Sequence, residues 1–338
     1  MSNICLPASL STTNAIEFVE KLYMLPEMEE YDFDFKFMEW VEPFALLYIS
    51  YHLAIFRLSR NLAKFTAHNF KISNAHLYAA HMGFFKSFGL DYGKNPGEAR
   101  GNSYYVPIEI LSIDSLKEEA YEERIELGDV LERHSRRLAS ILTRENDGAL
   151  VDTLEYALRE MFRNVVEHSG ANQIGFCAQY WPAKNRVELA ILDNGIGLSA
   201  SLKSNPFLNI SSDKDAINYS LLPGVSGKAY KGAPKQRNGF WSNSGFGLYM
   251  TSELCRNGGD FFICSGTSGV YLKGTQKRNI KANLEGTAIR LALQTQNIGS
   301  VKDRLDEYRS KGQTIASRLK GAIIEPSYAS TMLTRDFK

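Results

Sequence analysis

Glu160 and Asn164 place a carboxylate and a carboxamide four residues apart, and His168 follows at the same interval. Apolar residues recur at helical spacing through this stretch, so we expect the three polar side chains on one face of a helix. A carboxylate there could orient or deprotonate an attacking group. An amide oxygen suits Mg²⁺, which prefers oxygen ligands. Taken alone, the pattern is more typical of a solvated helix face.

Two glycine turns follow downstream. The first, residues 193–197, begins with Asp193 directly after the apolar run 187–192, which predicts a strand. A carboxylate at a strand end can accept a hydrogen bond from an exocyclic amine such as that of adenine, and glycines let a ligand approach the backbone. The second turn, residues 245–248, precedes an apolar helix, where backbone N–H groups can bind an anion. Either turn alone could equally be a hairpin or a tight loop.

These three elements, in this order and at these intervals, resemble the GHKL superfamily, which includes histidine kinases, gyrase-type and heat-shock chaperone ATPases, MutL and the anti-sigma-factor serine kinases. Glu160 and Asn164 resemble its N box, and the two turns resemble its glycine boxes. Gly286 and Thr287, on a predicted final strand, resemble its late Gly-Thr element. The resemblance covers residues 130–295 and implies a two-layer α/β sandwich of the Bergerat type that binds ATP and Mg²⁺.

The resemblance also implies roles for individual residues. Asn164 would hold Mg²⁺, and Asp193 would bind the adenine with support from Thr287. The second glycine turn would hold phosphate beneath a lid formed by residues 199–244. The implied nucleotide-binding set is Asn164, Asp193, Gly195, Gly197, Lys228, Gly245, Gly247, Leu248 and Thr287. Basic lid residues could neutralise phosphate or could simply be solvated: Lys228, Lys231, Lys235 and Arg237.

The position of Glu160 is most similar to that in the anti-sigma-factor serine kinases, where this residue acts as a base on a hydroxyl of a partner protein. Sensor histidine kinases carry an acceptor histidine on an upstream helix, but His134 is followed by a serine instead of the usual acidic residue. We therefore expect a serine/threonine protein kinase that acts on a protein partner. The alternative is an ATP-hydrolysing conformational switch, as in chaperone- or MutL-like dimers, with Glu160 activating water. A DNA-associated ATPase is a third candidate.

Residues 1–115 predict a small α/β domain. Alternation over residues 31–38 predicts a strand that runs into an apolar helix, residues 74–88 predict a second helix, and residues 104–111 could close the sheet. The strand-to-helix turn resembles that of a STAS domain, the fold of anti-sigma-factor antagonists, in which a serine of the turn is phosphorylated. Here the turn, residues 42–45, has no hydroxyl, which implies a docking or regulatory module. An unrelated α/β cap is the alternative.

The remaining segments complete the predicted organisation. Residues 116–148 are expected to form a charged linker and a helix, and residues 149–297 the ATP-binding domain. Residues 298–338 predict a charged helix and a frayed tail.

Composition sets broad limits on function. The chain has 338 residues, of which 44% are hydrophobic and 23% charged, as in ordinary globular proteins. A net charge of +1 provides no general basic field, so nucleic acid is an unlikely partner. The four cysteines are widely spaced, which favours free thiols in a reducing cytoplasm over a zinc site. The sequence shows no membrane-spanning run and no secretory signal, so we expect a cytoplasmic protein that could form a homodimer.

Overall fold

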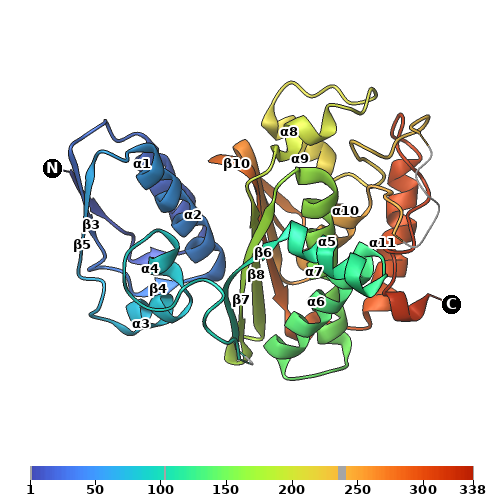
Figure 1. The fold of residues 1–338 in the computed structure, drawn as a ribbon. Helices are drawn as coiled ribbons and strands as arrows, with labels where there is room; N and C mark the ends of the chain where they lie inside the picture. The colour runs from blue at the N-terminus through green and yellow to red at the C-terminus, as the bar shows by residue number, and fades with distance from the viewer. Residues whose placement is uncertain (1, 103, 235–240, 338) are drawn as a thin grey trace.

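The structure is a computed structural model that describes residues 2–102, 104–234 and 241–337. Lys235 and Arg237, two of the lid cations considered above, lie outside these residues. The described chain has a mixed α/β fold, which confirms the class expected from the sequence. A large sheet carries helices on one face and a smaller N-terminal unit, residues 2–102, on the other (Figure 1).

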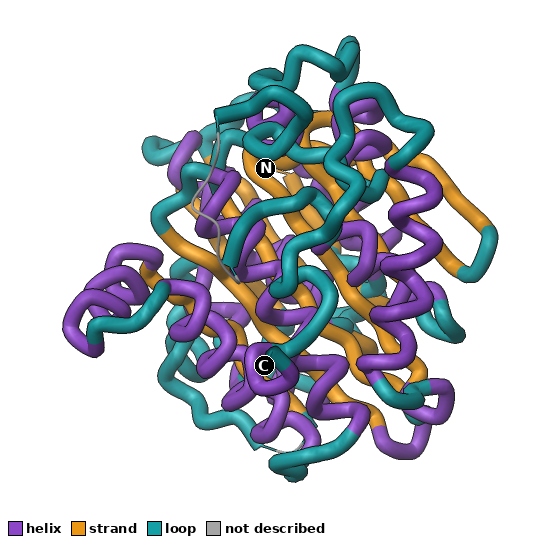
Figure 2. Tube along the Cα trace, turned by 90° about the vertical axis from the view of Figure 1, so that its right-hand side faces the viewer, coloured by secondary structure: helices purple, strands orange, loops and turns teal. Residues whose placement is uncertain are grey.

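The large sheet is antiparallel, with its strands in the order β6-β7-β8-β10-β9. These strands are β6 (Tyr105–Ser112), β7 (Gln173–Trp181), β8 (Arg186–Asp193), β9 (Asp260–Lys273) and β10 (Gln276–Gln294). Helices cover one face of the sheet, and Figure 2 shows them in front of the strands. They are α5 (Ile113–Glu123), α6 (Leu127–Thr143), α7 (Ala149–Asn164) and α10 (Gly247–Arg256), with α11 (Val301–Ala316) packed outside α7 and α10.

The central strand β8 is buried along most of its length because both faces of the sheet are covered. The odd-numbered residues Val187, Leu189 and Ile191 belong to the core under the helices. The even-numbered residues Ala190 and Leu192 belong to the core under the N-terminal unit. Side chains alternate along a strand, so Asp193 faces the helical layer. Thr287 of β10 is its direct cross-strand partner. The strand register therefore brings these two predicted site residues together.

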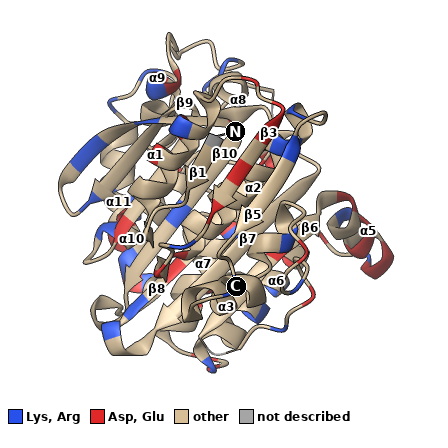
Figure 3. Cartoon of the chain, turned by 90° about the vertical axis from the view of Figure 1, so that its left-hand side faces the viewer, with Lys and Arg blue, Asp and Glu red and all other residues tan. Residues whose placement is uncertain are grey.

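The N-terminal unit has a parallel sheet of three strands in the order β1-β3-β5. Helices α1 and α2 lie between this sheet and the large one, as Figures 1 and 3 show. Because α2 is enclosed by both sheets, it is apolar on nearly every side. The elements of the unit are β1 (Ser2–Cys5), β2 (Ser9–Leu10), α1 (Thr12–Tyr23), β3 (Glu30–Asp34), β4 (Trp40–Val41), α2 (Pro43–Ser59), β5 (Lys64–His68), α3 (Asn74–His81) and α4 (Phe84–Ser87).

Several sequence expectations about boundaries need correction. The strand expected to close the N-terminal sheet is β6, which pairs with β7 and belongs to the large sheet instead. The charged stretch expected to contain a linker is largely helix α5, because Leu116 and Ala120 bury an apolar stripe that the surrounding charges conceal. The helix expected over residues 74–88 divides at Gly83, whose φ of 88° is left-handed.

The strand-to-helix turn of the N-terminal unit packs against the large sheet. The Phe44 N–H donates to Glu188 Oε1 at 3.3 Å, and the Phe44 ring meets Phe262 edge-on with centroids 5.3 Å apart. These contacts explain why this turn carries proline and phenylalanine, since it is an internal contact of the chain.

The C-terminal segment is held against α7, although a frayed tail was expected. Arg159 is fully buried, and its guanidinium donates to the carbonyl oxygens of Ala329 and Met332. The Thr334 N–H donates to Glu132 Oε1 at 2.9 Å. A buried guanidinium needs several acceptors, and the tail backbone supplies them. Among the described residues, no helix has the length and apolar character needed to cross a bilayer.

Candidate functional site

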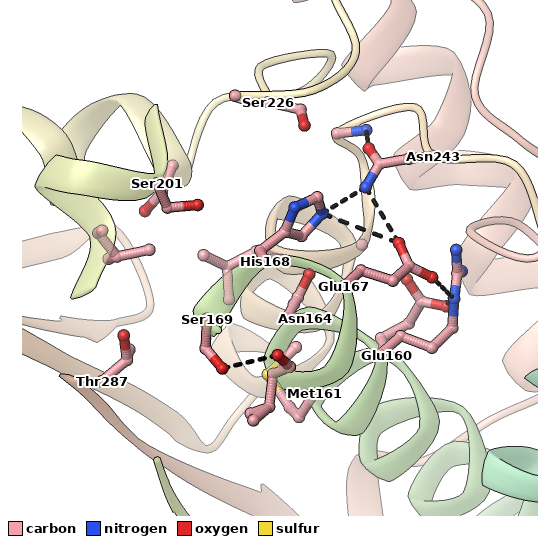
Figure 4. Close-up of a pocket in the computed structure, with 18 of the residues that line it drawn as sticks. Glu160, Met161, Asn164, Glu167, His168, Ser169, Ser201, Ser226, Asn243 and Thr287 are labelled. Carbon is pink, nitrogen blue, oxygen red and sulfur yellow. Dashed lines mark hydrogen bonds and ion pairs between the residues drawn. The ribbon is translucent and has the colours of Figure 1, made fainter. Parts of the chain in front are cut away.

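A cleft between α7, the lid and the ends of β8 and β10 gathers most of the predicted site residues (Figure 4). The space free of protein atoms, open mouth included, is about 880 Å³. The wall contains eight of the predicted residues: Glu160, Asn164, Asp193, Gly197, Gly245, Gly247, Leu248 and Thr287. Gly195 and Lys228 are outside the wall. Residues from four separate stretches of sequence therefore meet at one cleft.

Asn164 is the last residue of α7, and a π-helical turn, Val165–Ser169, follows it. Single π turns are frequent at functional sites because they disturb the regular helical spacing of side chains. The Asn164 Nδ2 atom is buried and has no hydrogen-bond partner among the described residues. Its amide lines the cleft, so its hydrogen-bonding capacity is not used within the protein. Because Nδ2 is a hydrogen-bond donor, this atom suits an acceptor such as a phosphate oxygen, whereas a cation would be bound by Oδ1 of the same amide.

Asp193 lies at the end of β8, at the base of the cleft. Burial raises the pKa of its carboxyl from 3.8 to about 6, while N–H groups of Gly195 and Thr287 favour the ionised form. The Gly195 N–H donates to Asp193 Oδ1 at 2.8 Å. A Cβ on Gly195 would stand 2.1 Å from the Ser169 carbonyl oxygen, so only glycine fits here. Gly195 thus acts by holding Asp193 in place.

Glu160 is 2% exposed and ion-paired within the protein. Its Oε1 lies 3.2 Å from Arg159 Nη2 and 3.2 Å from Arg163 Nη1. A Cβ on Gly247 would stand 2.1 Å from Glu160 Oε2, so that oxygen lies against the second glycine turn. Both guanidiniums make their closest contact with Oε1 and hold the carboxylate in position. Oε2 is the oxygen that remains for proton transfer.

His168 lies in the π turn and faces the cleft. Burial, with smaller contributions from Lys228 and Arg163, lowers its pKa from 6.5 to about 4. The ring is therefore neutral at neutral pH, and its Nε2 is hydrogen-bonded to Asn243 Nδ2. Asn243 also contacts Glu167 Oε2 at 3.2 Å, and its Oδ1 accepts the Gly245 N–H at 3.1 Å. Asn243 thus joins the helix of the first motif to the second glycine turn.

Sequence reasoning missed Asn243 and several hydroxyl residues of the wall. Asn243 stands two residues before Gly245, an Asx-turn spacing that could have indicated its role. Ser201 and Ser226 come from the lid, which includes helices α8 (Gly197–Leu202) and α9 (Asp213–Ser220). Ser330 comes from the C-terminal segment, and no local pattern in the sequence could have placed it here.

Lys228 and Lys231, the two proposed phosphate-neutralising lid residues that the structure describes, are not part of the cleft wall. Lys228 is exposed, and its Nζ donates to the Glu167 carbonyl oxygen. The Lys231 N–H donates to the Gly321 carbonyl oxygen at 2.9 Å, which links the lid to the C-terminal segment. His134, the upstream histidine considered as an acceptor, is paired with Glu119 at 2.9 Å and is absent from the cleft wall.

Comparisons with known proteins do not assign the chain. No protein-family model and no curated protein matches it. The arguments for its function therefore rest on the residues and their arrangement.

Proposed function

We propose that the chain is an ATP- and Mg²⁺-binding regulatory protein of the GHKL type, with a Bergerat-type nucleotide site and serine/threonine protein kinase activity toward a partner protein. The observation that supports this most is the meeting of the three sequence motifs and Thr287 at one cleft. The motifs were identified in the sequence from residue types, order and intervals, and nothing in that pattern alone requires the three segments to lie at one cleft.

The cleft residues suit the parts of a nucleotide. Asp193 can accept a hydrogen bond from the exocyclic amine of adenine, and the apolar side chains of Leu248 and Ile263 can pack against the base. The backbone of the second glycine turn, before α10, offers N–H groups to phosphate. Asn164 would hold Mg²⁺, whose role when bound would be to neutralise phosphate charge.

Glu160 would act on the attacking group through Oε2. In a kinase reaction this oxygen would take the proton of a partner's serine or threonine hydroxyl as that oxygen attacks the γ-phosphorus and ADP leaves. Arg159 and Arg163 would hold the carboxylate in position.

The contact between the lid and the C-terminal segment favours a second candidate, an ATP-hydrolysing conformational switch with Glu160 activating water. The Ile323 N–H of the C-terminal segment donates to the Gly224 carbonyl oxygen of the lid at 3.0 Å. A change in the lid would therefore reach a second surface of the molecule.

The nucleotide site can be tested by calorimetry with ATP and Mg²⁺. Asp193→Asn should weaken ATP binding by about tenfold or more, because it replaces an acceptor with a mixed donor and acceptor. Asn164→Ala should reduce the Mg²⁺ dependence of binding. Asn209→Ala, in the lid but outside the cleft wall, is a matched control. Unchanged ATP affinity in Asp193→Asn would refute the proposed site.

The two activities are separated by γ-labelled ATP. Label transferred to a co-purified protein supports a kinase, and release of free phosphate alone supports the switch. Glu160→Gln keeps an acceptor for both arginines but cannot take a proton, so it should bind ATP and lose either activity. Full activity in this variant would exclude Glu160 as the base.

A further inference from the structure

A second, larger cleft lies at the seam between the N-terminal unit and the large sheet. Its free space, open mouth included, is about 1200 Å³. One wall is the start of α1, and the other is the far half of the β9–β10 hairpin. The cleft shares no wall residue with the nucleotide site. We call it the seam cleft.

Positive side chains dominate the seam cleft. Arg186, Lys273, Lys277, Arg278 and Arg290 line it, and Glu42 is the single carboxylate among its described wall residues. Lys273, Lys277 and Arg278 lie close together in sequence around the β9–β10 turn, whereas Arg186 and Arg290 come from β8 and from the far end of β10. In Figure 3, Lys and Arg colour the hairpin beside α1.

Two of the five cations are neutralised within the protein. Arg290 is 3% exposed and pairs with Asp260 and, at 3.0 Å, with Glu188 Oε2. Arg186 contacts the same Glu188 oxygen at 3.2 Å. The five cations of the wall face three carboxylates, Asp260, Glu188 and Glu42, so positive charges exceed negative charges by two. The excess resides on the hairpin.

The hairpin cations have no carboxylate partner. Among residues 2–102, 104–234 and 241–337, no ion pair involves Lys273, Lys277 or Arg278. Partial burial, together with the charges of Lys214 and Arg256, lowers the pKa of Lys277. Arg278 instead donates to Thr13 Oγ1 at 3.3 Å, which joins the hairpin to α1. Solvent screens these exposed side chains from one another, and an anion bound among them would reduce their mutual repulsion further.

The start of α1 contributes further unused polar groups. Thr12, 5% exposed, has a hydroxyl without a hydrogen-bond partner in the described chain, and so does the Arg290 Nε atom. Both residues line the cleft. At this helix N-terminus the Thr12 N–H donates to Glu42 Oε2 at 3.3 Å and the Asn14 N–H donates to Ser11 Oγ at 3.4 Å, so the Thr12 hydroxyl, and not the helix end, is the unused group. Orphaned buried donors beside unpaired cations are a second, independent indication of an absent anionic ligand.

We propose that the seam cleft binds a small molecule that carries a phosphate dianion or a diphosphate. The excess of two positive charges matches such a group. The cations surround one concavity, with Glu42 within it, whereas a nucleic-acid backbone would need a continuous positive track. This site is independent of the proposed ATP site and does not require that proposal to hold.

Pyrophosphate without divalent cations is a suitable probe for the full chain, measured by calorimetry at low salt. It should bind the wild type, and the double variant Lys277→Gln/Arg278→Gln should bind about tenfold or more weakly because two charge-assisted bonds are lost. Lys302→Gln/Arg318→Gln removes the same charge from exposed positions of the C-terminal region and should bind as the wild type does. Asn164→Ala should also leave pyrophosphate binding unchanged.

Three outcomes would overturn the proposal. The double hairpin variant could bind pyrophosphate as tightly as the wild type while melting at the same temperature. Asn164→Ala could abolish binding, which would assign the signal to the nucleotide site. A single-stranded oligonucleotide could bind through Lys277 and Arg278 when pyrophosphate does not, which would make the cleft a polymer site.

Discussion

The proposed nucleotide site and the seam cleft differ in whether their charged side chains are paired within the protein. In the nucleotide site, Glu160 is held by two arginines and Asp193 by backbone N–H groups. In the seam cleft, Lys273, Lys277 and Arg278 have no ion pair among the described residues. The charged side chains of the first site are paired within the protein, whereas those of the second have no carboxylate partner among the described residues.

This difference separates two kinds of recognition. A site whose charges are already satisfied selects a ligand by shape and by individual hydrogen bonds, as an adenine-binding carboxylate does. A site with excess charge selects mainly by charge and is sensitive to salt. The same chain can thus hold one site that is rigid and specific and another that responds to the concentration of an anion.

The largest effect should come from breaking the internal pairing of the nucleotide site. Arg159→Met would leave Glu132 and Glu160 with fewer partners and would free two tail carbonyls, so it should destabilise the fold by about 3–5 kcal/mol. Arg278→Met, at the exposed seam cleft, should change stability by less than about 0.5 kcal/mol. Urea unfolding measures both. Equal losses of stability in the two variants would contradict the difference between a site with internally paired charges and one with unpaired charges.

A smaller effect is expected from Gly247→Ala. The new methyl group would meet Glu160 Oε2 and disturb both arginine pairs, at a cost of about 1–3 kcal/mol in stability, with weaker ATP binding. Gly299→Ala is the matched control, because a Cβ at Gly299 would meet no atom within 4 Å. Thermal melts and calorimetry would show whether the second glycine turn is as tightly packed as the structure indicates.

The smallest effect should be the pH dependence of nucleotide binding. Asp193 has a pKa of about 6, raised by burial, so it is mostly ionised at pH 7 and mostly protonated at pH 5. The proposed adenine contact uses the ionised form, so ATP affinity should fall by up to about tenfold over this range. ATP itself titrates in the same way in both measurements, so dividing the wild-type affinity by the Asp193→Asn affinity cancels that contribution. A ratio that stays constant from pH 7 to pH 5 would exclude Asp193 as the titrating group.

The nucleotide site was largely predictable because its residues lie in short motifs. Glu160 and Asn164 share a helix turn, and the alternation of β8 fixes the side on which Asp193 lies. Ser330 was not predictable, because it reaches the cleft through a tertiary contact of the tail with α7.

The seam cleft was only partly predictable. The basic residues of its hairpin, Lys273, Lys277 and Arg278, lie close together in the sequence, although the net charge of +1 gives no sign of them. The opposite wall comes from α1, more than 200 residues earlier, and no local pattern predicts the contact between Arg278 and Thr13 across 265 positions. The assignment of β6 failed for a related reason: strand propensity predicts a strand but does not identify the sheet that it joins.

The position of Ser330 in the cleft wall has a consequence for the order of events during protein synthesis. Tyr156, on α7, donates its hydroxyl hydrogen to the Ser330 carbonyl oxygen at 2.8 Å, across 174 positions of the chain. All three sequence motifs leave the ribosome before this partner has been made. The cleft of the nascent chain therefore lacks the Ser330 part of its wall until the tail has been synthesised and has docked against α7.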